Sequence, residues 1–87
     1  MAKTVVITGS TRGIGLGLAK EFLKRGCNVV VCGRSQVGVN KAVEQLTAEA
    51  GGANLLGVRC DVASFEQVQA LWDAGAKRFG RIDIWIN

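Results

Sequence analysis

The stretch of sequence that decides the fold is Thr8-Gly9-Ser10-Thr11-Arg12-Gly13-Ile14-Gly15. It follows a short β-branched run and precedes a segment of helical period, so we expect the turn between a first strand and a first helix. Its glycines let the backbone approach a ligand closely, and a phosphate there meets unpaired N–H groups and the positive end of the helix dipole. The stretch therefore predicts a pyrophosphate-binding loop, although a tight turn that only lets helix and sheet pack remains the alternative. The spacing is Gly-x3-Gly-x-Gly and differs from the more familiar GxGxxG string.

Short aliphatic runs alternate with longer segments of helical period along the rest of the chain, which is typical of βαβ units and a parallel sheet. We expect four strands, at Lys3–Thr8, Asn28–Gly33, Leu55–Cys60 and Ile82–Asn87. The right-handed crossover rule then predicts an α/β, doubly wound, Rossmann-like βαβαβαβ fold with strand order 3-2-1-4.

Three helices are expected between these strands, each with an apolar stripe toward the sheet. The stripes are Ile14, Leu18 and Phe22 beside Ala19 and Leu23 in the first helix, Val39, Val43, Leu46 and Ala50 in the second, and Val68, Leu71, Trp72 and Phe79 in the third. The third helix starts with an expected capping box, in which Ser64 accepts from an amide three residues on and Gln67 reaches back. Gly75 inside it costs roughly 1 kcal/mol relative to alanine.

Composition excludes several classes of function. The chain has 87 residues, enough for one small domain, and its 11 Lys and Arg against 7 Asp and Glu give a net charge of +4. The cations are dispersed and lack interleaved aromatic residues, so we expect no nucleic-acid partner. No apolar run is long enough to span a bilayer, and the first residues do not resemble a signal peptide, so we expect a cytoplasmic protein without a membrane partner. Three cysteines without CxxC spacing or any histidine argue against zinc and disulfides.

Arg34 stands at the end of the second expected strand, roughly twenty residues past the glycines, where dinucleotide folds place the side chain that meets the adenosine ribose. An acid there would accept from the 2′-hydroxyl of NAD, whereas a guanidinium offers forked donors to the 2′-phosphate of NADP. Arg12 adds a second cation, and Ser10 and Ser35 add hydroxyl donors. The pattern favours NADP, with a solvated strand-end arginine as the alternative.

Two further strand ends carry candidate cofactor contacts. Asp61, after the third strand, can accept from the adenine amino group while Val62 lines the pocket of the ring; alternatively, Asp61 only organises the turn before Ser64. Asn87 ends the fourth strand at the same edge, so its backbone and amide could reach the cofactor, or it is frayed as the final residue.

These sites together resemble the amino-terminal half of a short-chain dehydrogenase/reductase. The resemblance covers the whole chain and rests on the loop from Thr8 to Gly15, on Arg34, on Asp61-Val62 and on the strand Asp83-Ile84-Trp85-Ile86-Asn87. Within that family, strings such as Ile7-Thr8-Gly9-Ser10-Thr11-Arg12-Gly13-Ile14-Gly15 are similar to chlorophyll b reductase-like members. The resemblance implies that Arg12 and Arg34 are the basic pair that marks NADP preference.

The resemblance also implies an activity. Members of the family transfer hydride between a nicotinamide and a small-molecule carbonyl or alcohol, using a later Ser, Tyr and Lys, and often form homo-oligomers. This chain has no Tyr and no Tyr-x3-Lys pair, so no catalytic residue is assigned to it. Residues 1–87 are therefore expected to be the NADP-binding half-domain of a longer oxidoreductase. The alternative is a non-catalytic nucleotide-binding or assembly module.

Overall fold

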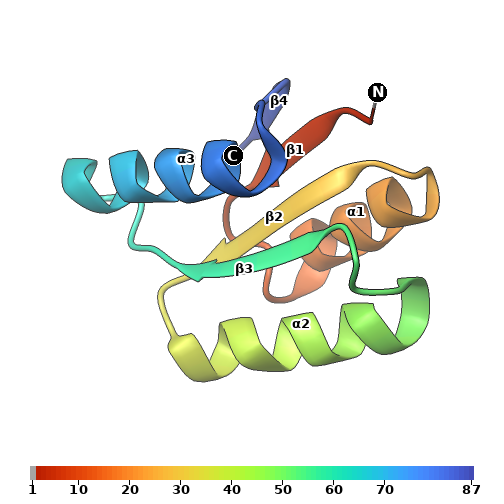
Figure 1. Cartoon of the computed structure of the whole chain (residues 1–87). Helices are drawn as coiled ribbons and strands as arrows, with labels where there is room; N and C mark the ends of the chain where they lie inside the picture. The colour runs from red at the N-terminus through yellow and green to blue at the C-terminus, as the bar shows by residue number, and fades with distance from the viewer. Residues whose placement is uncertain (1) are drawn as a thin grey trace.

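The fold is built on a sheet of parallel strands. The computed structural model describes residues 2–87, with helices on both faces of a four-stranded sheet (Figure 1). In chain order its elements are β1 (Thr4–Ile7), α1 (Gly13–Lys24), β2 (Asn28–Gly33), α2 (Gln36–Ala50), β3 (Leu55–Arg59), α3 (Phe65–Phe79) and β4 (Ile84–Ile86). All strand pairs are parallel and the order is β3-β2-β1-β4, which confirms the predicted topology. The strands other than β2 are shorter than predicted.

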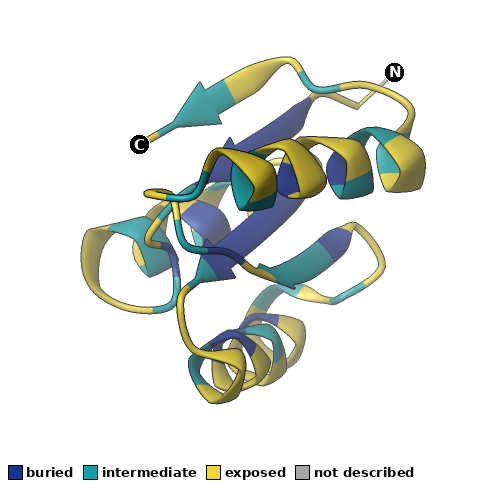
Figure 2. Ribbon diagram, turned by 90° about the vertical axis from the view of Figure 1, so that its left-hand side faces the viewer, coloured by how far each residue is buried: buried dark blue, intermediate teal, exposed yellow. Residues whose placement is uncertain are grey.

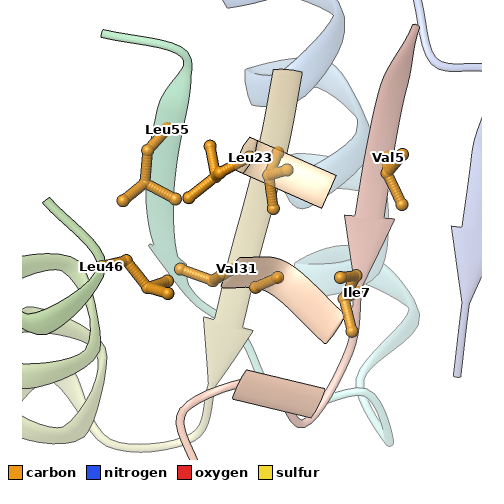
Figure 3. Close-up of a cluster of buried hydrophobic side chains, with 8 residues drawn as sticks. Val5, Ile7, Leu23, Val31, Leu46 and Leu55 are labelled. Carbon is orange, nitrogen blue, oxygen red and sulfur yellow. The ribbon is translucent and has the colours of Figure 1, made fainter. Parts of the chain in front are cut away.

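The two central strands, β1 and β2, are apolar on both faces because helices cover both sides of the sheet (Figure 2). One face packs against α1 and α2, and its core residues are Val5, Ile7, Ala19, Leu23, Val29, Val31, Leu46 and Leu55 (Figure 3). The other face packs against α3 through Val6, Val30, Cys32, Cys60 and Leu71. Two thin cores on opposite faces therefore hold the sheet in place.

The predicted inner stripe of α1 is wrong in part. Ile14 is 86% exposed and Leu18 is also exposed, whereas Ala19 and Leu23 are buried and Leu16 packs against the same core. The reason is the close approach of α1 to the preceding loop at Gly15, described below, which fixes the rotation of the helix about its axis. Ile14 and Leu18 consequently face away from the sheet.

The other two helices begin at serine caps. Ser35 Oγ accepts from Gly38 N–H at the start of α2, and Ser64 Oγ accepts from Gln67 N–H at the start of α3. The second half of the predicted capping box is wrong, because Gln67 Oε1 accepts from the N–H of Asp61 at 2.8 Å and not from that of Ser64. This longer reach ties α3 directly to the end of β3.

The inner face of α3 is as predicted at Val68, Leu71 and Phe79, which pack on the core, and differs from the prediction at Trp72. Leu71 and Gly75 are buried, while Trp72 is 44% exposed and its ring stacks on Trp85 at 6.0 Å. A Cβ at Gly75 would lie 3.3 Å from Val30 and 3.4 Å from Ile82. Glycine at this position therefore lets the helix lie close to the sheet, which accounts for a residue that weakens the helix itself.

The edge strand β4 is attached to β1 at both ends. Thr4 N–H donates to the Asp83 carboxylate at 2.8 Å, and Thr8 N–H donates to the Ile86 carbonyl at 2.8 Å. Parallel pairing thus brings the carboxyl ends of all four strands to one edge of the sheet. Loops that follow β1, β2 and β3 meet at this edge.

Candidate cofactor-binding site

A cavity of about 660 Å³ opens at the carboxyl edge of the sheet. Its walls come from the loop between β1 and α1 with the first residue of that helix (residues 8–13, here called the glycine loop), from the end of β2 and the first turns of α2, and from the residues after β3. The lining residues are Gly9, Thr11, Arg12, Gly33, Arg34, Ser35, Gly38, Lys41, Cys60 and Val62. Open doubly wound sheets bind their ligands at this edge, so the cavity is the candidate site.

The glycine loop forms one wall and has the geometry of a phosphate cradle. Gly9 and Gly13 have φ values of 60° and 62°, which side-chain-bearing residues rarely adopt, and a Cβ at either would meet nothing within 4 Å. At Gly15 a Cβ would lie 2.7 Å from the Gly9 carbonyl oxygen and 2.9 Å from the Ser10 Cα. Only glycine allows α1 to lie this close to the loop.

The amino terminus of α1 is left without a side-chain cap. Arg12 occupies the cap position in an extended conformation and makes no side-chain cap hydrogen bond, in contrast to Ser35 and Ser64 on the other helices. The first N–H groups of a helix have no partner within the helix, and together with the dipole they attract an anion. This open, glycine-lined end of α1 therefore has the donors that an anionic group such as a phosphate needs.

Ser10 lies beneath the cradle and faces the core. It is fully buried, and its hydroxyl donates to the Ile7 carbonyl at 2.6 Å and accepts from Cys32 N–H at 2.9 Å. These bonds join the ends of β1 and β2 just below the cavity. Thr11, the next residue, does line the cavity.

Three cations line the cavity: Arg12 from the glycine loop, Arg34 from the end of β2 and Lys41 from α2. Among the lining residues in the described part of the chain there is no Asp or Glu. The Arg59 Nε donates to the Arg34 carbonyl at 3.0 Å, which ties the peptide at Arg34 to the end of β3. The cavity therefore presents positive charge without a compensating carboxylate.

The remaining predicted residues lie around the cavity in different ways. Val62 lines it and is 55% exposed, but Asp61 is not among the lining residues and accepts from Ala63 N–H in a local turn. Ser35 lines the cavity, with its hydroxyl engaged as the cap of α2. Asn87 lies beside the end of β1, where its side-chain oxygen accepts from the Thr8 hydroxyl at 3.3 Å. The exposed Ile14 is not part of the lining.

Two thiols lie near the cavity, and neither is set up as a nucleophile. Burial raises the pKa of Cys32 to about 11, with a smaller opposing effect of a backbone hydrogen bond from Gly9. Burial also raises the pKa of Cys60, which lines the cavity. Both thiols are therefore protonated at neutral pH and act as packing residues.

Sequence reasoning missed Lys41 and Gly38, although a signal for both exists. A helix that follows a parallel strand starts at the carboxyl edge, so only its first two turns reach a ligand there. Gly38 and Lys41 fall within these turns of α2, seven residues or fewer from Arg34. Applying this distance rule to the dispersed cations would have selected Lys41.

Over residues 2–87, no cluster of three or more metal-ligating side chains occurs. In the same part of the chain, no helix has the length and apolarity that crossing a membrane requires.

The chain was compared with known proteins. The sequence profile of short chain dehydrogenases matches residues 3–87. The chain is 52% identical over 83 residues to chlorophyll(ide) b reductase NOL, chloroplastic, of Oryza sativa subsp. japonica, a match that covers 95% of this chain and 24% of that relative. The chain thus spans about a quarter of the length of this curated relative.

Solved structures also match the fold of this chain. F189W actinorhodin polyketide ketoreductase with NADPH superimposes with a TM-score of 0.89 at 33% identity, over 97% of this chain and 31% of that chain. The 3-ketoacyl-(acyl-carrier-protein) reductase from Brucella melitensis complexed with NADH gives 0.85 at 32% identity, over 95% and 32% of the two chains. With a matching profile across nearly all of its residues and this agreement in structure, the chain belongs to the short-chain dehydrogenase family.

Proposed function

We propose that residues 1–87 are the NADP-binding part of a longer single domain, an oxidoreductase that moves hydride between a nicotinamide and a carbonyl or alcohol. The observation that carries the choice of NADP is the cavity lined by Arg12 and Arg34, with no carboxylate among its lining residues over residues 2–87. The bound cofactor supplies the hydride chemistry. The residues of this chain bind and orient it.

The glycine loop is assigned to the pyrophosphate. Gly9 and Gly13 present open backbone, Gly15 keeps α1 close beneath it, and the uncapped helix end offers N–H donors. Ser10 contributes by anchoring this loop to β2, because its hydroxyl already bonds to the ends of both strands. Thr11 lines the wall between the loop and Arg34. Ile14 contributes the backbone of the first turn.

The ribose end of the cofactor is assigned to Arg34 and Arg12. A planar guanidinium binds a phosphate through two parallel hydrogen bonds, and an acid that would prefer the 2′-hydroxyl of NAD is missing from the lining. Ser35 lies next to Arg34 and keeps its hydroxyl hydrogen free to donate, because its oxygen is the acceptor in the cap bond.

The adenine is assigned to Val62 and Asp61. Val62 is the apolar lining residue after β3, and one carboxylate oxygen of Asp61 holds the local turn, which leaves the other available as an acceptor. Asn87 is assigned to the nicotinamide side, since it ends the neighbouring strand β4 beside Thr8.

We infer the direction of hydride transfer and the substrate class from the relatives. The proteins compared above are named as reductases, of chlorophyll(ide) b, of a polyketide and of a 3-ketoacyl group, so a carbonyl compound is the proposed substrate class. Because the chain spans 24% of the rice relative, the substrate site and any homo-oligomer belong to the whole protein. Cytoplasm is proposed as the location. A plastid location, as in the name of the rice relative, is the alternative that imaging of a fluorescent fusion would identify.

Titration of NADP and NAD against the purified full-length protein tests the proposal, with Arg34→Asp as the diagnostic variant. Each charge-assisted contact is worth about 1.5–3 kcal/mol, so the variant should bind NADP about ten- to a hundredfold more weakly and NAD at least as well. Arg25→Asp, at the opposite end of α1, is a control that changes the charge equally. Equal affinities of the wild-type protein for the two cofactors would refute NADP selection. Binding without turnover of any carbonyl compound would indicate a non-catalytic module.

A further inference from the structure

We propose that Lys41 is a third recognition residue for the cofactor, acting on the 2′-phosphate of its ribose, and that Gly38 keeps the path from Lys41 to that phosphate open. This inference rests on the proposed function, because it requires an NADP-type ligand in the cavity. It adds residues from α2 to a site otherwise built from loops at the strand ends.

Position on α2 is the first argument. The helix begins at Gln36, directly after Arg34 and its cap Ser35, so its first two turns stand beside the end of β2. Gly38 and Lys41 are three residues apart and share one face of the helix, and both line the cavity. Lys41 therefore enters the same space as Arg34 from a different element.

The unusual residue on this face is Gly38. A Cβ there would make only ordinary contacts, at 3.7 Å to Ser35 and 3.9 Å to Thr11, so neither crowding nor backbone conformation requires glycine. Glycine is nevertheless among the poorest helix formers. Its effect at this position is to leave the wall between Thr11 and Lys41 free of side-chain atoms, which a longer residue would fill.

Charge supplies the third argument. Lys20 on α1 pairs with Glu49 at 3.1 Å, and Arg25 at the C-cap of α1 pairs with Glu21 at 3.2 Å. Within residues 2–87, neither Lys41 nor the two cavity arginines has a carboxylate partner within 4.0 Å. A cavity whose charged lining residues, in the described part of the chain, are all cations raises the local concentration of an anion.

The region of the cavity distinguishes the 2′-phosphate from the pyrophosphate. The pyrophosphate is assigned to the end of α1, after β1, whereas Lys41 lies on α2, beyond the end of β2. The ribose and its phosphate are assigned to that second side, next to Arg34. Lys41 is therefore expected to act on ligands that carry a 2′-phosphate and to have little effect on those that lack it.

The test compares two small probes, 2′,5′-ADP and 5′-AMP, by calorimetric titration of the purified full-length protein at low and high salt. Lys41→Met should lower the affinity for 2′,5′-ADP about three- to tenfold and leave the affinity for 5′-AMP unchanged. The loss should be smaller at high salt. Lys41→Arg should retain most of the affinity for 2′,5′-ADP. Gly38→Leu should also weaken 2′,5′-ADP more than 5′-AMP. Lys77→Met on α3 is the matched control, since it removes the same charge from a helix away from the cavity.

The outcomes separate the two proposals. If the wild-type protein binds both probes equally, NADP selection fails and the role of Lys41 fails with it. If the wild-type protein prefers 2′,5′-ADP but Lys41→Met behaves like Lys77→Met, the role of Lys41 is refuted while NADP selection stands. Equal weakening of both probes by Lys41→Met, with an unchanged thermal midpoint, would also refute the specific role in 2′-phosphate binding.

Discussion

Two glycines on α1, Gly15 and Gly17, allow a sharp test of the phosphate cradle. Each would gain a Cβ in an alanine variant, and each lies in the first half of the same helix. At Gly15 that Cβ would lie 2.7 Å from the Gly9 carbonyl oxygen and 2.9 Å from the Ser10 Cα, whereas at Gly17 it would meet nothing within 4 Å. The two substitutions are therefore chemically identical and differ only in what surrounds the new methyl group.

The magnitudes follow from two opposing effects. Replacing a helical glycine by alanine stabilises the helix by about 1 kcal/mol, and this gain applies to both variants. Overpacking costs about 1–3 kcal/mol, and at Gly15 the crowded atoms are backbone atoms that cannot rotate away. Gly17→Ala should thus raise the free energy of unfolding. The free energy of unfolding of Gly15→Ala should be lower than that of Gly17→Ala by about 1–3 kcal/mol.

Urea denaturation and NADP titration of the full-length protein measure both consequences. Because Gly15→Ala must displace the loop that faces the phosphate, we expect its affinity for NADP to fall about tenfold or more, while Gly17→Ala binds like the wild type. Equal free energies of unfolding for the two variants would show that the loop moves away without cost. Equal affinities would show that the close approach at Gly15 has no part in binding.

Two further predictions concern residues that hold the site and the edge strand in place. Arg59→Met removes the hydrogen bond to the Arg34 carbonyl and should weaken NADP about two- to fivefold in titration, whereas Arg78→Met, which loses a similar bond to a carbonyl far from the cavity, should not. The hydrogen bond from Arg81, with a second from a backbone N–H, lowers the pKa of Asp83, so its contribution to stability is present above the usual carboxyl pKa of 3.8 and is lost as the pH falls through the lowered value. Urea unfolding at pH 3 to 7 should show Asp83→Asn less stable than the wild type at pH 7 and a shrinking difference toward pH 3; a constant difference would contradict this.

The topology could be predicted from the sequence because its signals are local. β2 follows the predicted bounds, since an uninterrupted apolar run between a helix-ending glycine and Arg34 has few alternatives. The strand order then follows from the doubly wound arrangement together with the handedness of the crossovers. The rotation of α1 about its axis was predicted wrongly, because the period of the apolar residues on α1 fits two faces. The contact of Gly15 with the loop is not local, and it selects the rotation that exposes Ile14 and Leu18.

For the site residues too, predictions from local sequence position succeeded, and features that depend on distant contacts were missed. Gly9, Thr11, Arg12, Arg34, Ser35 and Val62 were predicted from their places at strand ends, and the structure brings them to one cavity. Ser10 and Trp72 show what sequence position cannot give. The Ser10 hydroxyl is used inside the core, and Trp72 stacks on Trp85 with 44% of its surface exposed.

Charge and shape at the cavity are carried by different residues. The backbone of the cradle depends on Gly9, Gly13 and Gly15, where a Cβ means a strained φ or a collision with the chain. Arg34 instead follows the last residue of β2 and precedes the cap of α2, and both neighbouring elements form hydrogen bonds without its side chain. Its substitution should therefore alter which cofactor binds and leave the fold intact. Changes at the glycines should affect NAD and NADP alike, since both cofactors carry the pyrophosphate that we assign to the cradle.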